Sequence, residues 1–306
     1  MRFNKILLFC IIITILTLTV NAAQNDTVPS YVNITGNIPS TTIFLDEVGQ
    51  DGTDNSITLL PNQTIKVACW GTAFDLDGLW DLNDVDAWIY AESSSRDQPD
   101  NNSIHYTNKT CDISNLETTG EWNCTFDVWF YAENSTWTCI VNISDDENYF
   151  NDTANDTATI QDLVAVNVGN NSIDFGTKAV GVSYPANVEV LVYNEGNVEL
   201  DLQLDAWEQN ATQGSETDSD MSFNCTIGQI PVDYLVFNVT PTSFDAAIPM
   251  VDTGATSPVQ FDLAHQEGGG NDRPTNASTY WGIRIPYKIA GLCTGYIRYI
   301  GVAGGP

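Results

Sequence analysis

Apolar side chains in this sequence recur at every second position, in short runs separated by Gly, Pro, Asn and Asp. No stretch keeps the spacing of about 3.6 residues that marks an amphipathic helix. Alternation places successive side chains on opposite faces of an extended chain, so each run predicts a half-buried β-strand. These runs predict an all-β fold of two immunoglobulin-like β-sandwiches, a fold for which seven or eight short strands are expected in about 100 to 150 residues.

The clearest alternating runs predict four strands in the first half of the chain and eight in the second. They cover residues 65–70, 85–91, 124–132 and 136–144, then 163–168, 172–176, 186–193, 198–206, 234–239, 259–264, 280–286 and 295–302. Residues 144–161 are acidic and poor in apolar side chains, which predicts the linker between two domains. The segment Tyr193-Asn194-Glu195-Gly196-Asn197 separates two alternating runs and predicts the turn of a hairpin.

The first residues have the layout of a secretory signal peptide. Arg2 and Lys5 precede an apolar run over residues 6–20, and small residues follow it, which predicts cleavage after Ala22. An uncleaved membrane anchor is the alternative, but the run is shorter than the roughly 20 apolar residues of a spanning helix. We therefore expect residues 1–22 to be removed and the mature chain to be extracellular, without membrane insertion.

The mature chain is expected to have three parts: residues 23–46, a first sandwich over 47–157 and a second over 158–306. In the first part, Val28, Val32 and Ile34 alternate with polar residues. This segment is either the first edge strand of the first sandwich or a free arm. A free arm would add a strand to the sheet of a neighbouring subunit, as in pilus-like polymers.

The chain is strongly acidic, with 40 Asp and Glu against 10 Lys and Arg and a formal net charge of −30 at pH 7. Binding to nucleic acids and to anionic membranes depends on Lys and Arg that neutralise phosphate charge. The composition therefore excludes both kinds of partner. Hydrophobic residues make up 42% of the chain, which is enough for folded cores rather than a disordered acidic tail.

Six cysteines remain after removal of Cys10 with the signal peptide. An even number in an exported chain predicts disulfides, and the absence of C-x-x-C pairs disfavours a zinc site. The four cysteines of the first half allow three connectivities. Alternation places Cys69 and Cys139 on the apolar faces of their strands. We expect the pairs Cys69–Cys139, Cys111–Cys124 and Cys225–Cys293.

Fifteen Asn-x-Ser/Thr sequons predict N-linked glycans. Random placement of the same residues would give about six matches to this acceptor pattern, although a bias toward Asn and Thr is an alternative explanation. Apolar neighbours on both sides of Asn33, Asn142, Asn224 and Asn238 predict that these asparagines face solvent. The full set is Asn25, Asn33, Asn62, Asn101, Asn108, Asn123, Asn134, Asn142, Asn151, Asn155, Asn170, Asn210, Asn224, Asn238 and Asn276.

An acidic, glycine-containing stretch is the candidate metal site, with Asp75, Asp77, Asp81 and Asp84 as ligands. Carboxylates in such a loop are typical of calcium, which takes six to eight oxygen ligands. Calcium is the candidate cofactor, and no other cofactor is expected. The pattern is incomplete because Ala73 fills the first liganding position. A solvated turn with local hydrogen bonds is the alternative.

The sequence contains no motif of a known catalytic site. His105 and His265 are the only histidines, and neither lies beside a nucleophile elbow or a zinc-binding helix pattern. We do not expect an enzyme. The tryptophans are either core residues or platforms for sugars, with core the favoured interpretation. Those considered are Trp80, Trp88, Trp122, Trp129, Trp137, Trp207 and Trp281.

Three short segments resemble known families. Residues 172–177, Gly181 and residues 193–197 resemble the signature of immunoglobulin-like domains of the ASPM/SPD-2/Hydin type. Residues 75–85 resemble a loop of polycystic-kidney-disease-like repeats, and residues 279–286 are similar to archaeal surface sandwiches. These resemblances imply an immunoglobulin-like fold and an archaeal cell-surface location, without an activity.

The leading hypothesis is a structural glycoprotein that assembles with copies of itself into a surface filament or a surface layer. Val28, Val32 and Ile34 would then form the donor strand that completes a neighbour's sheet. The alternative is a monomeric adhesin or carbohydrate-binding module in which aromatic side chains hold the ligand.

Overall fold

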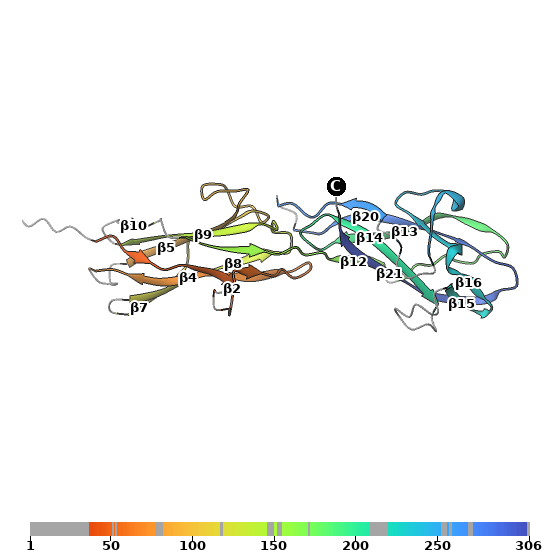
Figure 1. Cartoon of the computed structure of the whole chain (residues 1–306), viewed down its shortest axis with the longest axis horizontal. Coiled ribbons are helices and arrows are strands. Elements are labelled where there is room, and N and C mark those ends of the chain that lie inside the picture. The colour runs from red at the N-terminus through yellow and green to blue at the C-terminus, as the bar shows by residue number, and fades with distance from the viewer. Residues whose placement is uncertain are drawn as a thin grey trace, which may run out of the picture. The chain divides into compact units, whose positions relative to one another are not determined.

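The structure is a computed structural model, and all its regular elements apart from short 3₁₀ turns are β-strands (Figure 1). It describes residues 37–50, 52, 54–76, 82–116, 119–145, 150–151, 155–170, 172–208, 220–251, 256, 259–268 and 272–304. The predicted signal peptide and the predicted donor strand at Val28, Val32 and Ile34 lie outside these ranges. Four sheets pair as two β-sandwiches, which confirms the predicted fold class. Within the described ranges, no helix has the length and apolarity needed to cross a membrane.

The first sandwich contains two sheets that are antiparallel except for one pair. In the first sheet the order is β1-β4-β8-β7, with β2 also paired to β4. The second sheet has the order β3-β11-β9-β5-β6, with β10 on β9 and a parallel pairing of β3 with β11. The bounds are β1 Ser40–Thr41, β2 Phe44–Glu47, β3 Ser56–Ile57, β4 Thr64–Phe74, β5 Leu82–Ala91, β6 His105–Asn108, β7 Asp112–Leu116, β8 Thr119–Trp129, β9 Thr136–Asp145, β10 Phe150–Asn151 and β11 Asn155–Ile160.

The second sandwich has sheets of order β12-β13-β20-β17-β18 and β16-β15-β21-β14-β19. The bounds are β12 Val166–Val168, β13 Ser183–Asn194, β14 Leu200–Glu208, β15 Met221–Ile227, β16 Gln229–Pro231, β17 Leu235–Asn238, β18 Ile248–Pro249, β19 Val259–Leu263, β20 Thr275–Arg284 and β21 Ala290–Ala303. In its core, the Trp281 indole is fully buried and donates a 2.7 Å hydrogen bond to the Tyr299 hydroxyl. A buried indole N–H needs such a partner.

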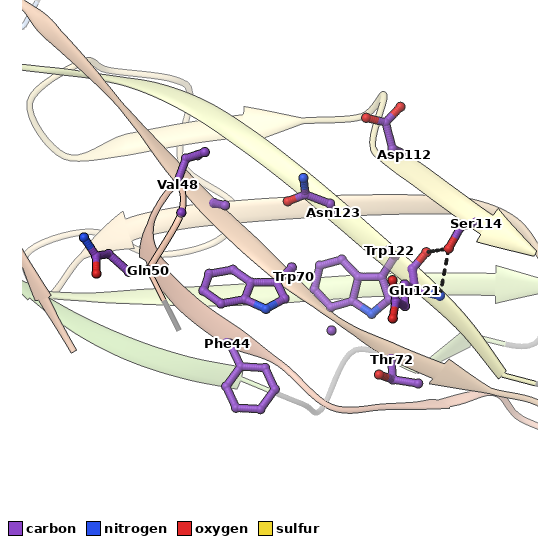
Figure 2. A pocket seen from close by; sticks show the side chains of 13 residues that line it. Phe44, Val48, Gln50, Trp70, Thr72, Asp112, Ser114, Glu121, Trp122 and Asn123 are labelled. Atoms are coloured by element: carbon purple, nitrogen blue, oxygen red, sulfur yellow. Dashed lines mark hydrogen bonds between the residues drawn. The ribbon is translucent and has the colours of Figure 1, made fainter. Parts of the chain in front are cut away.

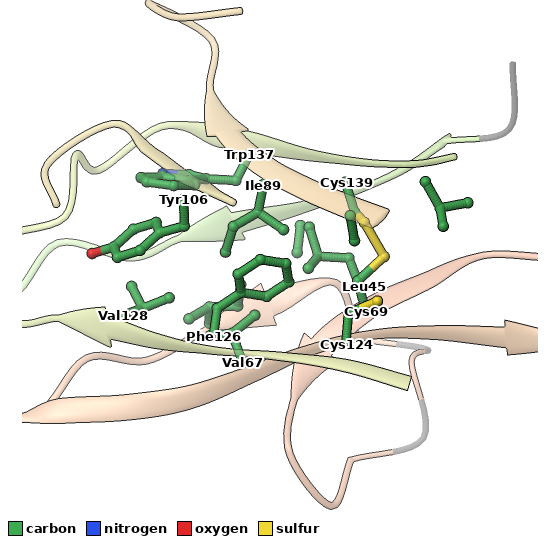
Figure 3. Close-up of a cluster of buried hydrophobic side chains, with 14 of the residues drawn as sticks. Leu45, Val67, Cys69, Ile89, Tyr106, Cys124, Phe126, Val128, Trp137 and Cys139 are labelled. Carbon is green, nitrogen blue, oxygen red and sulfur yellow. A yellow bond between two sulfur atoms is a disulfide. The ribbon is translucent and has the colours of Figure 1, made fainter. Parts of the chain in front are cut away.

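Alternation builds the core of the first sandwich. In β9, Trp137, Cys139, Val141 and Ile143 are all buried, and the residues between them point outward. Figure 3 shows Trp137 and Cys139 among the side chains between the two sheets, with the Cys69–Cys139 disulfide joining the two layers. Burial of this apolar surface is the main favourable contribution to folding.

The structure contains three disulfides, and they join the expected pairs, which are Cys69–Cys139, Cys111–Cys124 and Cys225–Cys293. Cys69 and Cys139 are fully buried, as expected for residues on the apolar faces of their strands. Cys225 and Cys293 face each other directly in the β15–β21 pair. Each sandwich is therefore cross-linked internally.

The structure corrects the predicted linker at residues 144–161. This segment contains β10 and β11, which both pair with β9 in the first sandwich. In β11 only Ala158 and Ile160 are buried, while Asn155, Thr157 and Thr159 are exposed. Two inward apolar side chains are enough to pack this strand against the core. The average composition of the segment therefore resembles that of a polar linker.

The predicted hairpin at residues 193–197 is also wrong. β13 and β14 belong to different sheets, so this turn carries the chain across the sandwich. Asn194 and Asn197 are both buried there, and the backbone of Gly196 lies so close to Leu163 that a Cβ would be 1.9 Å from its carbonyl oxygen. Alternation shows which face of a strand is apolar, but it does not show which sheet the strand joins.

Two further elements differ from the sequence expectation. Residues 172–176 form no strand, although Ile173 and Phe175 still pack against the core of the second sandwich. Residues 40–47, at the end of the predicted arm, pair with β4 of the same chain. The described end of this segment is thus an edge strand, in agreement with one of the two alternatives.

Candidate functional site

An open groove lies on the outer face of the β1-β4-β8-β7 sheet, with a volume of about 560 Å³ (Figure 2). We call it the aromatic groove and define it by Phe44, Trp70, Asp112, Glu121 and Asn123. Four of these residues form one row across the strands, because Phe44 pairs with Trp70, Trp70 with Asn123 and Asn123 with Asp112. Residues that pair across strands have side chains on the same face.

Alternation in β4 explains why a tryptophan faces this groove. Cys69 points into the core, so its neighbour Trp70 must point outward. Phe44 is 41% exposed and its ring centroid lies 5.9 Å from that of Trp70, at an interplanar angle of 32°. Two neighbouring aromatic rings on a rigid sheet therefore form the floor of the groove.

The segment after β2 forms one wall of the groove, and Asp46 fixes its conformation. The buried Asp46 carboxylate accepts hydrogen bonds from the backbone N–H groups of Glu47, at 2.7 Å, and Gly52, at 3.2 Å. Burial raises the pKa of Asp46, while these two N–H groups act in the opposite direction. Gly52 has a φ of +73°, which favours glycine, and lies against Phe44 and Trp70.

The opposite wall is polar and acidic. Asp112 and Glu121 contribute carboxylates, Asn123 contributes an amide, and Ser114 donates to the backbone carbonyl of Glu121 at 3.1 Å. Aromatic faces beside hydrogen-bonding groups are a combination that can hold a sugar ring, whose C–H face is apolar and whose hydroxyls are polar. The described lining residues of the groove include no histidine and no cysteine.

Sequence reasoning missed Trp70, although alternation beside Cys69 already indicates its outward orientation. Of the tryptophans considered, Trp122, Trp137 and Trp281 are buried in the cores. The Trp88 ring is covered by the Arg96 guanidinium at 4.5 Å from its centroid. The other three are half-buried or outside the described residues: Trp129, which stacks on Tyr131, Trp207, which contacts Tyr296, and Trp80, which is not described.

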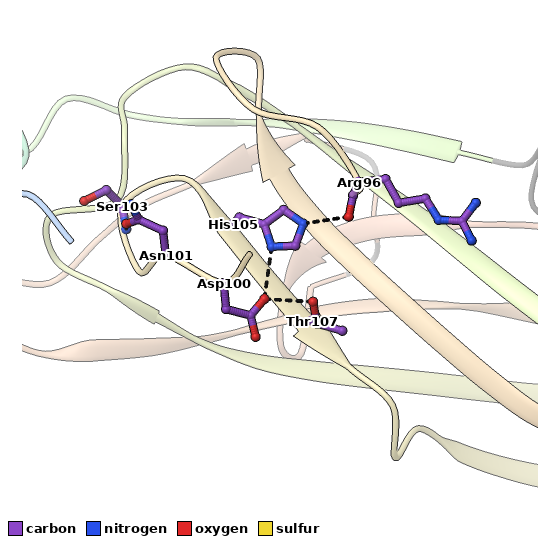
Figure 4. A network of polar contacts seen from close by, with 6 residues as sticks. All are labelled: Arg96, Asp100, Asn101, Ser103, His105 and Thr107. Carbon is purple, nitrogen blue, oxygen red and sulfur yellow. Dashed lines mark hydrogen bonds and ion pairs between the residues drawn. The ribbon is translucent and has the colours of Figure 1, made fainter. Parts of the chain in front are cut away.

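His105 has a structural environment rather than an open site (Figure 4). Its ring is 1% exposed, with Nδ1 at 3.0 Å from the Asp100 carboxylate and Nε2 at 3.1 Å from the Arg96 carbonyl. Thr107 donates to the same Asp100 oxygen at 2.7 Å. Both ring nitrogens thus lie within hydrogen-bonding distance of oxygen atoms of the same loop. These contacts of His105 stabilise the loop that precedes β6.

The predicted metal ligands are only partly described. Asp75 is buried and Asp84 is exposed, while Asp77 and Asp81 lie outside the described residues. Among the described residues, no group of three or more potential ligands is close enough to hold a metal ion. Burial and the Asp84 carboxylate raise the pKa of Asp86, so the charged form of Asp86 weakens the native state at neutral pH. Calcium stays a prediction.

Eleven sequon asparagines have described side chains, and none of these is fully buried. The exposed ones are Asn62, Asn123, Asn134, Asn155, Asn170 and Asn276, and the half-buried ones are Asn101, Asn108, Asn142, Asn224 and Asn238. The side chains of Asn25, Asn33, Asn151 and Asn210 are outside the described set. Most predicted glycan positions in the described part of the chain are therefore accessible from solvent.

No protein-family model matches the sequence, and no curated protein matches it. Among solved structures, the chain is similar to the C-terminal domain of the AgI/II polypeptide BspA of Streptococcus agalactiae, with 10% identity and a TM-score of 0.24. That match covers 87% of this chain and 96% of the other, and a second structure, BspA_C_WT, matches equally well over 86% and 96%. A TM-score this low carries no argument about function. The resemblances of single segments and the archaeal source stay predictions.

Proposed function

We propose that this chain is a non-catalytic adhesive protein of the cell surface that holds a saccharide in the aromatic groove. Three disulfides within the sandwiches support an extracellular location, because such bonds persist in oxidising compartments. The signal-peptide pattern at the start of the chain supports the same location.

One observation carries the binding function: Trp70 and Phe44 lie side by side on the outside of a sheet, next to two carboxylates and an amide. The strand β4, which carries Trp70, is cross-linked to the facing sheet through Cys69, and β2, which carries Phe44, is paired to β4, so the rings are held in place before a ligand arrives. A preformed site loses less conformational entropy on binding than a flexible one.

The test uses protein exported to the periplasm of a bacterium without N-glycosylation, where disulfides form and glycans are absent. We expect this protein to bind a subset of saccharides on an array, and Trp70→Ala to weaken that binding about tenfold, which corresponds to roughly 1.4 kcal/mol. Trp88→Ala is the matched control, because its ring lies on the other sheet under Arg96. Equal loss in both variants, or no saccharide bound at all, would argue against the proposal.

Self-assembly is a second candidate function, favoured by a groove on the second sandwich whose lining includes several large apolar side chains. This groove has a volume of about 580 Å³ and is lined by Ile173, Phe175, Val180, Ile285 and Leu292 among others. Leu292 is 76% exposed, an unusual position for a large apolar side chain. The proposed occupant is the segment with Val28, Val32 and Ile34 from another copy, whose alternate apolar side chains would fill the groove.

The oligomeric state distinguishes this function. We expect sedimentation of the mature protein to show assemblies, and Leu292→Ser or deletion of residues 24–34 to convert them to monomers. Val48→Ser, which changes an exposed apolar residue of the first sandwich, is the control and should leave the assemblies intact. A mature protein that stays monomeric at high concentration would exclude assembly through this groove.

A further inference from the structure

Asn123 has two properties that coincide at no other described sequon. It begins the acceptor sequence Asn123-Cys124-Thr125, and its side chain lines the aromatic groove. The residue is exposed on β8, where its outward direction follows from the burial of Trp122 and Cys124 on either side. A modification at this position would therefore lie inside the proposed binding site.

The strand register brings Asn123 next to the aromatic floor. Asn123 lies directly opposite Trp70, and residues opposite each other have Cβ atoms about 4.5–5.5 Å apart. Figure 2 shows the Asn123 amide and the Trp70 ring on the same side of the sheet. The first sugar of a glycan on the Asn123 amide nitrogen therefore starts within reach of the indole face.

The Asn123 amide is also available for modification, unlike those of several other sequons. Asn108 donates to the Thr125 carbonyl at 2.9 Å, Asn134 to the Asp162 carboxylate at 2.7 Å, and Asn238 to the Thr240 carbonyl at 3.1 Å. Toward the described residues, Asn123 makes no side-chain hydrogen bond of this kind. No internal contact competes with a glycan here.

We infer that an N-linked glycan on Asn123 packs its first sugar against Trp70 and Phe44 and so occupies the aromatic groove. The apolar C–H face of a pyranose covers the indole, while its hydroxyls reach the carboxylates of Asp112 and Glu121. One consequence rests on the proposed function of saccharide binding. The glycan on Asn123 closes the groove to free saccharides, and loss of that glycan opens it.

The packing of the glycan is tested by a thermal double-mutant cycle in a secreting eukaryotic host that attaches N-glycans. Thr125→Ala removes the acceptor sequence but keeps Asn123, and the Thr125 carbonyl that Asn108 uses remains. With Trp70 present, we expect Thr125→Ala to lower the melting temperature by about 3 °C. In the Trp70→Ala background the same change should have less than half of this effect, because the sugar has lost its aromatic partner.

Thr157→Ala is the matched control, since it removes the exposed sequon at Asn155, which faces Ile140 rather than an exposed aromatic ring. Its effect on the melting temperature should be the same in the wild-type background and in the Trp70→Ala background. Mass spectrometry of the secreted protein gives the occupancy of each sequon. An unmodified Asn123 in a protein modified at Asn155, or an equal effect of Thr125→Ala in both backgrounds, would overturn the inference.

Saccharide binding by the same proteins separates this inference from the proposed function. We expect Thr125→Ala to bind array saccharides at least tenfold more tightly than the glycosylated wild type. If the melting temperatures show coupling but neither protein binds a saccharide, the glycan packs on Trp70 and the adhesive function fails. If both bind equally and no coupling is found, the adhesive function stands and the role of the Asn123 glycan fails.

Discussion

Replacing both Cys69 and Cys139 with alanine should lower the free energy of unfolding of the first sandwich by about 4 kcal/mol. The bond closes a loop with a sequence separation of 70 residues, and its removal returns that conformational freedom to the unfolded chain. Both sulfur atoms are buried between the two sheets, so the replacement also leaves unfilled space in the core. Hydrogen exchange of the β4 and β9 backbone measures the loss, because these two strands carry the cysteines.

The double replacement of Cys111 and Cys124 is the internal comparison. Its loop has a sequence separation of 13 residues, for which the same reasoning gives about 3 kcal/mol. The exchange rates of β14 and β21 in the second sandwich should not change in either variant. If removal of Cys111–Cys124 lowered the free energy of unfolding more than removal of Cys69–Cys139, Cys69–Cys139 would not be the main cross-link of this core.

Asn197→Ala should destabilise the protein by about 3 kcal/mol. The buried Asn197 amide donates to the carbonyls of Ala132, at 3.0 Å, and Gln161, at 3.1 Å, and accepts from the backbone N–H of Leu163 at 2.6 Å. Alanine leaves these three backbone groups without this partner, and the group on Ala132 is buried away from water. Denaturant unfolding followed by tryptophan fluorescence measures the change in midpoint.

Two further variants define the cause of that loss. Asn197→Asp keeps an acceptor for Leu163 but places a carboxylate oxygen against two carbonyls, so it should be at least as harmful as alanine. Glu199→Ala changes an exposed side chain close by and should stay within about 0.5 kcal/mol of the wild type. A harmless Asn197→Ala would mean that these hydrogen bonds contribute little to the fold.

Many of the strands and the Cys69–Cys139 pair could be predicted from the sequence for one physical reason, which is that alternation reports the buried face of each strand. Cys69 and Cys139 fall on such faces, and the structure joins them. Alternation does not predict how the strands are connected. The turn at Asn194 and Asn197 joins two sheets because buried amide hydrogen bonds hold it there, and the pattern of apolar residues contains no record of those bonds.

The candidate groove shows the same limit. Alternation alone indicates that Trp70 points outward, so half of its floor could be found in the sequence. Phe44 and Asn123 join Trp70 only through strand register, between positions far apart in the chain. Register depends on the packing of whole strands against a core, and a single sequence does not reveal it. The sequence therefore predicts a glycan on Asn123, but only the structure shows that Asn123 lines the groove.

The two long disulfide loops have a mechanical consequence when the chain is pulled from its ends. Cys69–Cys139 and Cys225–Cys293 have sequence separations of 70 and 68 residues, and these segments cannot extend when the chain is pulled from its ends. Fully stretched, each segment would span roughly 230 Å. The residues inside each loop are therefore withheld from extension when a sandwich unfolds under tension, while the residues outside it still extend. The strands β5 to β8 and β16 to β20 lie wholly inside these loops, so the two ends of each group stay covalently joined in the unfolded chain.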